Sequence, residues 1–205
     1  MELTLAQKDA LTELINIGYG RAAAALSEMT GYRIHLEVPQ LALLDIEEVA
    51  PRLRWMMEGE VVCVNQVFSG SIAGNALLLL EQPAALILSQ LINDVDAKWE
   101  VTSAEHRETV MEVGNILLNP CLGVFGNLPK VQVSFTLPEL QLDSIDGVLR
   151  STKVEDEQLS HALMVKTHFH LRARNVSGYL VIILGLTSLV RVLHELDRWQ
   201  EGLGQ

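Results

Sequence analysis

One short pattern occurs twice in this 205-residue chain, with the second copy shifted by 99 positions, and it constrains the fold more than any other feature. The pattern is an acidic residue, a glutamate four positions later and an asparagine three positions after that. It comprises Asp9, Glu13 and Asn16 in the first copy and Glu108, Glu112 and Asn115 in the second. In a helix this spacing places all three side chains on one face. The sequence therefore predicts two long helices that carry the same polar stripe.

Apolar residues recur on the opposite face of the first predicted helix. They are Leu11, Leu14, Ile15, Ala22, Ala25, Leu26 and Met29. This periodicity is typical of an amphipathic helix that packs on a core. The acid and amide side chains are thus expected to face solvent.

The duplication extends beyond the two helices. Pro39 returns as Pro138, and the apolar residues that follow each proline keep the same spacing. Each half reads as helix, strand, short helix, hairpin and helix. Strands joined by hairpins indicate a largely antiparallel sheet, with helices packed against it. We predict one α/β (α+β) domain over residues 1–205, a pseudo-twofold fold built from two repeats at about residues 4–98 and 102–200.

Helix ends and interruptions can also be predicted. Thr4 is expected to cap the first helix, with Gln7 completing a capping box. Pro51 is expected to stop or bend a short acidic helix, and Pro120 to kink or shorten the second long helix. A half-buried strand is predicted from alternation of apolar residues at Val131, Val133, Phe135 and Leu137.

Composition limits the kinds of partner that the protein is expected to bind and the compartment in which it is expected. The net charge of −11 argues against nucleic acid or an anionic membrane as a main partner. Cys63 and Cys121 are far apart, which fits two buried thiols in a reducing cytoplasm. The first residues lack a basic segment followed by an apolar one, so no signal peptide is expected. The apolar runs are too short for a membrane span.

The residue types in the repeated pattern limit the chemistry. Asparagine is neither a base nor a nucleophile, but its amide both donates and accepts hydrogen bonds and can orient water. A glutamate one turn away can bind a cation on a partner or act as a base. The sequence holds no local nucleophile–histidine set, phosphate-binding loop or zinc-protease motif. What remains is a surface that offers an acid and an amide to another macromolecule.

These residues resemble the signature of the CheC / CheX / FliY family of chemotaxis response-regulator phosphatases, with the greatest similarity to CheC. The resemblance is carried by Asp9, Glu13 and Asn16, by Glu112 and Asn115, and by the proline that follows each copy. Glu108 departs from the pattern, because the family prefers Asp or Ser there. Asp9 and Glu108 are assigned to partner docking. With the second halves of the repeats included, the resemblance covers nearly the whole chain.

The resemblance implies a hydrolase that removes the aspartyl phosphate of a CheY-type response regulator. Asn16 and Asn115 would orient the attacking water, while Glu13 and Glu112 would dock a lysine of the regulator. No cofactor or metal is expected on this chain, because the regulator supplies Mg²⁺. The chain is expected to be a cytoplasmic monomer. If Pro120 displaces the second stripe, the first site should be the stronger.

Three other interpretations stay open at this stage. The chain would act as a non-catalytic adaptor if it binds the receptor deamidase CheD without hydrolysis. It would be a diverged sensor domain if an apolar pocket lay between the halves. His168 and His170 alternate along a strand, but no nearby acid or cysteine completes a metal-ligand set, so an exposed strand face is expected there.

Overall fold

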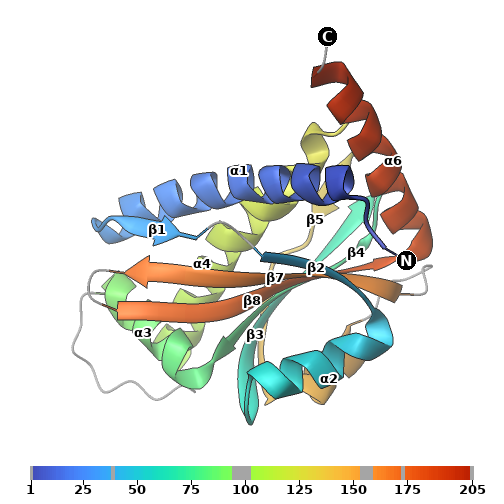
Figure 1. Ribbon diagram of the computed structural model, residues 1–205. Coiled ribbons are helices and arrows are strands. Elements are labelled where there is room, and N and C mark those ends of the chain that lie inside the picture. Colours follow the sequence, from blue (N-terminus) through green and yellow to red (C-terminus); the bar gives the residue numbers. More distant parts are fainter. Residues whose placement is uncertain (1, 38–39, 94–102, 153–158, 172–173, 204–205) are drawn as a thin grey trace.

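The computed structural model describes residues 2–37, 40–93, 103–152, 159–171 and 174–203 (Figure 1). The first half contains helix α1 (Leu5–Thr30), strands β1 (Ile34–Leu36) and β2 (Gln40–Asp45), helix α2 (Ile46–Met56), the hairpin β3 (Glu60–Gly70) and β4 (Gly74–Glu81), and helix α3 (Gln82–Asn93). The second half contains helix α4 (Ala104–Gly123), a 3₁₀ turn (Phe125–Asn127), strands β5 (Val133–Phe135) and β6 (Glu139–Ser144), helix α5 (Ile145–Ser151), the hairpin β7 (Leu159–Leu171) and β8 (Arg174–Gly185), and helix α6 (Leu186–Leu203).

All strands of the described chain join one antiparallel sheet. The order is β1-β7-β8-β4-β3-β5, with β2 also paired to β7 and β6 also paired to β3. The first strands of each half therefore pair with the hairpin of the other half, so neither half completes its sheet alone. When each strand is replaced by its counterpart in the other half, the same strand order results, read from the opposite edge of the sheet. This bears out the predicted mixed α/β, largely antiparallel, pseudo-twofold fold.

The centre of the sheet lies between β4 and β8, one strand from each half. Leu77 is directly opposite Val181, and Gly74 and Gly178 stand three residues before them in their respective strands. Every described residue of β4 except Glu81 is buried. A strand covered on both faces is expected to be apolar throughout, which matches the run of leucines from Leu77 to Leu80.

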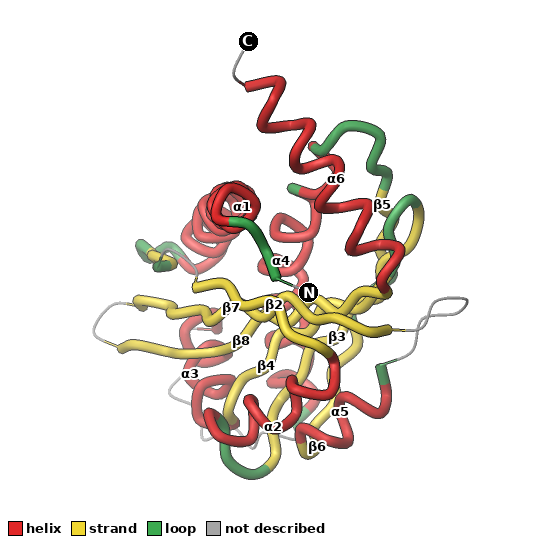
Figure 2. Tube along the Cα trace, turned by 45° about the vertical axis from the view of Figure 1, so that its right-hand side comes forward, coloured by secondary structure: helices red, strands yellow, loops and turns green. Residues whose placement is uncertain are grey.

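The sheet separates two apolar layers. On one face, side chains that include Leu78 and Leu80 pack with α1, α3, α4 and α6. On the other face, side chains that include Leu77 and Leu79 pack with α2 and α5. Figure 2 shows α2 and α5 on one side of the strands and α1, α4 and α6 on the other. Burial of both layers is the main stabilising contribution, at roughly 25 cal/mol per Å² of apolar surface.

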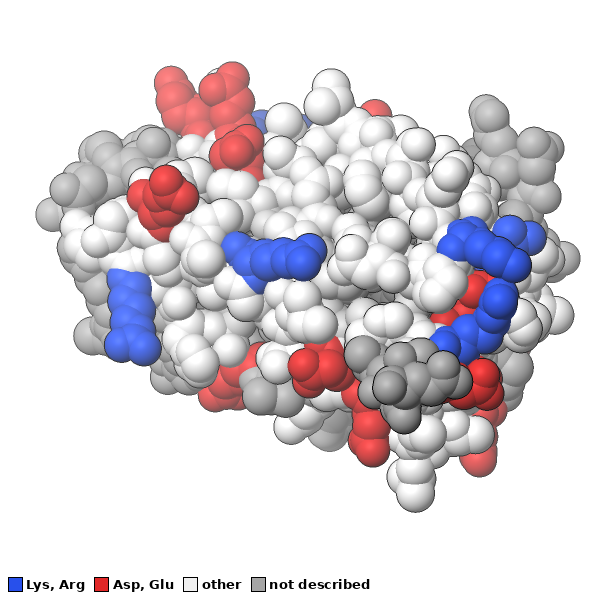
Figure 3. All heavy atoms as spheres, turned by 90° about the horizontal axis from the view of Figure 1, so that it is seen from above, with Lys and Arg blue, Asp and Glu red and all other residues white. Residues whose placement is uncertain are grey.

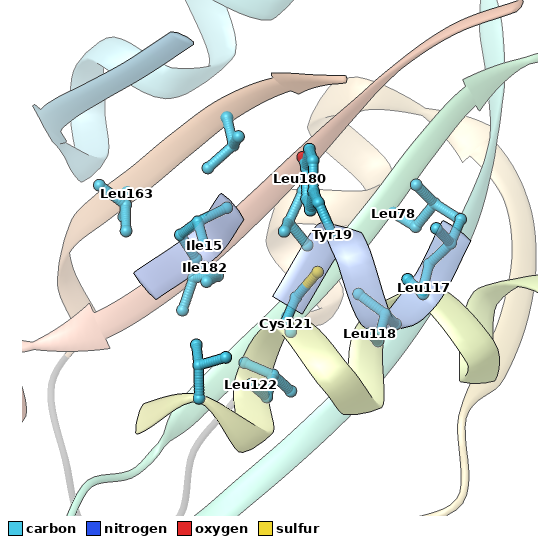
Figure 4. Close-up of a cluster of buried hydrophobic side chains, with 14 of the residues drawn as sticks. Ile15, Tyr19, Leu78, Leu117, Leu118, Cys121, Leu122, Leu163, Leu180 and Ile182 are labelled. Atoms are coloured by element: carbon cyan, nitrogen blue, oxygen red, sulfur yellow. The ribbon is translucent and has the colours of Figure 1, made fainter. Parts of the chain in front are cut away.

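The two long helices pack against each other over the sheet (Figure 4). Ile15 and Tyr19 of α1 meet Leu118 and Cys121 of α4 in a cluster that also includes strand residues such as Leu180. The contact fixes the rotation of both helices about their axes, and hence which side chains face outward.

The predicted start of α1 is confirmed. The Thr4 hydroxyl accepts a hydrogen bond from the Gln7 backbone N–H, and the Thr4 backbone N–H donates to the Gln7 side chain, both at 3.1 Å. This is the reciprocal capping box expected from the sequence. Gly31 ends the helix in the left-handed conformation, with φ of 69°.

Pro51 does not stop α2, which continues to Met56, and Pro120 does not end α4, which extends to Gly123. A proline inside a helix removes one backbone hydrogen bond, and the packing of each helix on the core outweighs that loss. The end of one predicted strand was wrong. The strand expected to reach Leu137 ends at Phe135, and Leu137 is 88% exposed. Pro39, which marks the repeat in the first half, lies outside the described residues.

Within the described chain, one segment is long and apolar enough to meet a membrane-span criterion. It is Ala104–Asn127, and half of its most apolar window is buried inside the protein. Because this segment packs on α1 and the sheet, its apolar character is accounted for by the core.

Candidate functional site: two acid–amide stripes

The first stripe lies on the outer face of α1. Asp9, Glu13 and Asn16 are all exposed, as the spacing predicts. The buried residues of the same helix are Ala10, Leu11, Leu14, Ile15, Gly18, Tyr19, Ala22 and Leu26. In the described part of the chain, no hydrogen bond or ion pair engages the side chains of Glu13 and Asn16. Their donors and acceptors are available to a partner.

The second stripe lies on α4. Glu108 and Glu112 are exposed, whereas Asn115 is half-buried. The buried residues of this helix are His106, Val110, Val113, Gly114, Leu117, Leu118, Cys121 and Leu122. Gly114 allows α4 to lie close to the sheet, because a Cβ there would approach Cγ1 of Val64 to 2.5 Å. The structure thus places both stripes at the surface, on helices whose backs are held by the same core.

The two asparagines differ in their surroundings. The Asn115 side-chain oxygen accepts a hydrogen bond from Nδ2 of Asn119 at 2.5 Å. The Asn119 oxygen in turn accepts from Nε2 of Gln66 on β3 at 2.9 Å. Asn16 has no comparable neighbour, because the residue four positions later is Gly20. The Asn115 amide is therefore restrained by a hydrogen bond within the protein, whereas the Asn16 amide makes none among the described residues.

Sequence reasoning missed Asn119 and Gln66. Asn119 could have been found from its spacing, since it lies one turn after Asn115 on the same helix face. Gln66 is an amide within the apolar run of β3, which is itself a signal, because a buried polar side chain needs a partner. The pairing of the two depends on how α4 lies on the sheet.

Charged side chains on this side of the molecule do not form one patch. Figure 3 looks onto the molecule from the side of α1 and shows small groups of charged side chains toward the two ends, with a largely uncharged surface between them. The net charge of −11 is therefore not concentrated in one acidic patch on this face.

The alternative sites from the sequence gain no support. No group of three or more His, Cys, Asp and Glu side chains in the described chain is arranged to hold a metal ion. His168 is instead within hydrogen-bond distance of the Ser177 hydroxyl, at 2.9 Å. A surface depression does lie between the halves, but Arg54, Glu58 and Asp146 line it, and it lies beside α2 and α5 rather than beside the stripes. Its lining mixes these charged side chains with the apolar Met57 and Ile145.

Comparisons with known proteins agree with the site. The model of the CheC-like family matches residues 7–42, which include the whole first stripe. The CheY-P phosphatase CheC of Bacillus subtilis is 29% identical over 168 residues, 78% of each chain. The chain is thus similar to CheC over most of its length. This bears out the family resemblance seen in the sequence.

The fold of this chain is also found in solved structures. FliY of Thermotoga maritima has a TM-score of 0.76 at 19% identity, over 97% of this chain and 99% of FliY. A CheX-CheY-BeF₃-Mg²⁺ complex from Borrelia burgdorferi has a TM-score of 0.50 at 18% identity, over 82% of this chain and 96% of the matched chain. At these identities the likeness shows the fold alone, so function rests on the site.

Proposed function

We propose that this CheC-like chain is a phosphatase that hydrolyses the aspartyl phosphate of a CheY-type response regulator. The observation that carries the proposal is an acid and an amide at the surface of each of two packed helices, with Asn16 exposed and Asn115 half-buried. Similarity to a protein named CheY-P phosphatase supports the substrate, and a CheX-CheY complex among the structural neighbours supports the partner. A cytoplasmic location is part of this proposal, because the substrate would be a phosphorylated regulator.

The asparagines supply the proposed chemistry. Asn16 or Asn115 would enter the active site of the regulator, where the amide would hydrogen-bond the attacking water in line with the phosphoryl group. The amide takes no proton and forms no covalent bond. Its contribution is to hold the water in a reactive position, and positioning of this kind accounts for large rate gains.

The acids supply the proposed docking. Glu13 or Glu112 would pair with a lysine of the regulator, and Asp9 or Glu108 would contribute to the same contact one turn earlier. Mg²⁺ would be bound by the regulator and would neutralise the developing charge on the phosphoryl oxygens. The catalyst itself would need no metal.

The direct test is phosphate release from a phosphorylated CheY-type regulator with Mg²⁺ present. The wild type is compared with Asn16→Ala, Asn115→Ala and the double variant. Each single variant is expected to keep part of the activity. The double variant is expected to lose it, by on the order of 100-fold, because misplacing the reacting water has a cost of that size.

Asn127→Ala is the matched control, because Asn127 is an exposed asparagine away from both stripes. It should hydrolyse at the wild-type rate. Equal rates for the wild type and the double variant would reject the proposed chemistry. Regulator binding without any hydrolysis by the wild type would instead favour an adaptor, which binding of CheD would test.

A further inference from the structure

The Asn115 amide belongs to a chain of hydrogen bonds that crosses three elements. Asn119 Nδ2 donates to the Asn115 oxygen, and Gln66 Nε2 donates to the Asn119 oxygen. Gln66 Nε2 also donates to the backbone carbonyl of Thr136, at 3.0 Å. Helix α4, strand β3 and the segment after β5 are thereby joined at one end of the second stripe.

The donor-to-acceptor direction of these hydrogen bonds follows from one backbone group, the Thr136 carbonyl. The Thr136 carbonyl can only accept, so the nitrogen of the Gln66 amide must face it. That same nitrogen then meets the oxygen of Asn119, which leaves the Asn119 nitrogen to donate to Asn115. The orientations of three side-chain amides are therefore determined together, although each alone could be reversed.

The network persists despite a cost. Gln66 is 1% exposed, and its Oε1 has no hydrogen-bond partner among the residues that the structure describes. Leaving a buried acceptor unpaired is unfavourable, and such groups are rare in folded proteins. Reversing the Gln66 amide would satisfy nothing, because its oxygen would then face the Thr136 carbonyl. The unpaired Oε1 is explained if Nε2 of Gln66 is needed to donate to Asn119 and to the Thr136 carbonyl.

The first stripe has no such arrangement. Gly20 occupies the place of Asn119, and a Cβ on Gly20 would meet no atom within 4 Å. The space beside Asn16 is therefore open, and its carboxamide can rotate. The two stripes share residue types but differ in how firmly the amide is held.

We propose that Asn119, held by Gln66, is a positioning residue that fixes the Asn115 carboxamide and makes the second stripe the preorganised catalytic site. This rests on the proposed phosphatase function. One lone pair of the Asn115 oxygen is occupied by Asn119, which leaves the second lone pair and both amide hydrogens for water. Because the rotation of Asn115 is already restricted, less freedom is lost when the regulator docks.

Asn119→Asp is the sharpest variant. The carboxylate has nearly the same shape and still accepts from Gln66, but it cannot donate to Asn115. In an Asn16→Ala background, where only the second stripe acts, kcat should fall about three- to tenfold, the range expected when one side chain is no longer held. The KM for the phosphorylated regulator should change little, because Asn119 does not provide the docking charge.

The same substitution in an Asn115→Ala background is the matched control. Only the first stripe acts there, so Asn119→Asp should leave kcat unchanged. An equal loss in both backgrounds would show a general structural defect and would overturn the proposal. No change in either background would also overturn it.

A measurement independent of activity separates this proposal from the phosphatase assignment. The side-chain amide resonances of Asn115 are followed by ¹⁵N NMR in the wild-type protein and in Asn119→Asp. We expect the Asn115 resonances to shift in the variant, because its oxygen loses the hydrogen bond from Asn119. Unchanged resonances would refute the positioning role, whereas changed resonances with no hydrolysis by any form would refute the phosphatase function alone.

Discussion

Gly18 of α1 packs directly on the backbone of Pro120 in α4. A Cβ on Gly18 would lie 2.9 Å from the Pro120 carbonyl oxygen and 2.9 Å from the Cα of Cys121. The two helices that carry the stripes therefore meet backbone to backbone, two residues beyond Asn16 and five beyond Asn115. This contact sets the separation of the helices, because no side chain lies between them at that point.

Gly18→Ala and Gly20→Ala should have opposite effects on stability. The new methyl group at position 18 would push α1 from α4, at a cost of about 1–3 kcal/mol. At position 20 a Cβ meets nothing within 4 Å, so alanine should stabilise the helix by about 0.5–1 kcal/mol. Urea unfolding of both variants measures the difference. A loss of stability for both would contradict the packing described for Gly20.

Removing the docking charges should weaken regulator binding without destroying the fold. Under the proposed function, the Glu13→Gln, Glu112→Gln double variant should bind a phosphorylated regulator about two- to fivefold more weakly per site at low salt. The difference should shrink as salt is added, since exposed charges are screened. Titration at two salt concentrations measures it, with Glu28→Gln, an exposed glutamate further along α1, as the control.

Stability should fall below neutral pH partly because of His106. Burial lowers the pKa of His106 below its ordinary value of 6.5, and the nearby charge of Arg107 adds to this. Between the ordinary pKa and the lowered one, the unfolded chain binds a proton that the folded chain does not, so protonation favours unfolding. The free energy of unfolding should drop as pH falls through about 6.5. The drop from pH 7.5 to 5.5 should be smaller in His106→Gln, and an equal drop would contradict the burial of a neutral ring.

Neither thiol should react in the folded protein. Cys63 and Cys121 are buried on opposite faces of the sheet, and burial raises the pKa of both thiols far above neutral. The reactive thiolate is therefore scarce and enclosed. A thiol reagent should label both only after denaturant is added. Rapid labelling of Cys121 in native protein would show that the contact between α1 and α4 opens readily.

Much of the fold could be predicted from the sequence, because it depends on residues that are close together along the chain. The helical period places Asp9, Glu13 and Asn16 on one face regardless of what packs behind them. The capping box at Thr4 and Gln7 is likewise a local pattern. Local rules did not decide where the helices end, because Pro51 and Pro120 lie inside helices whose packing outweighs the loss of a single hydrogen bond.

The sequence alone determined the exposed faces of the two long helices, because periodicity depends only on neighbours along the chain. It did not determine that β1 and β2 would pair with the hairpin of the second half, nor that Gln66 would meet Asn119. Those contacts join residues far apart in sequence, and their formation depends on how the sheet is assembled. The difference between the free Asn16 and the held Asn115 is therefore a property of tertiary structure.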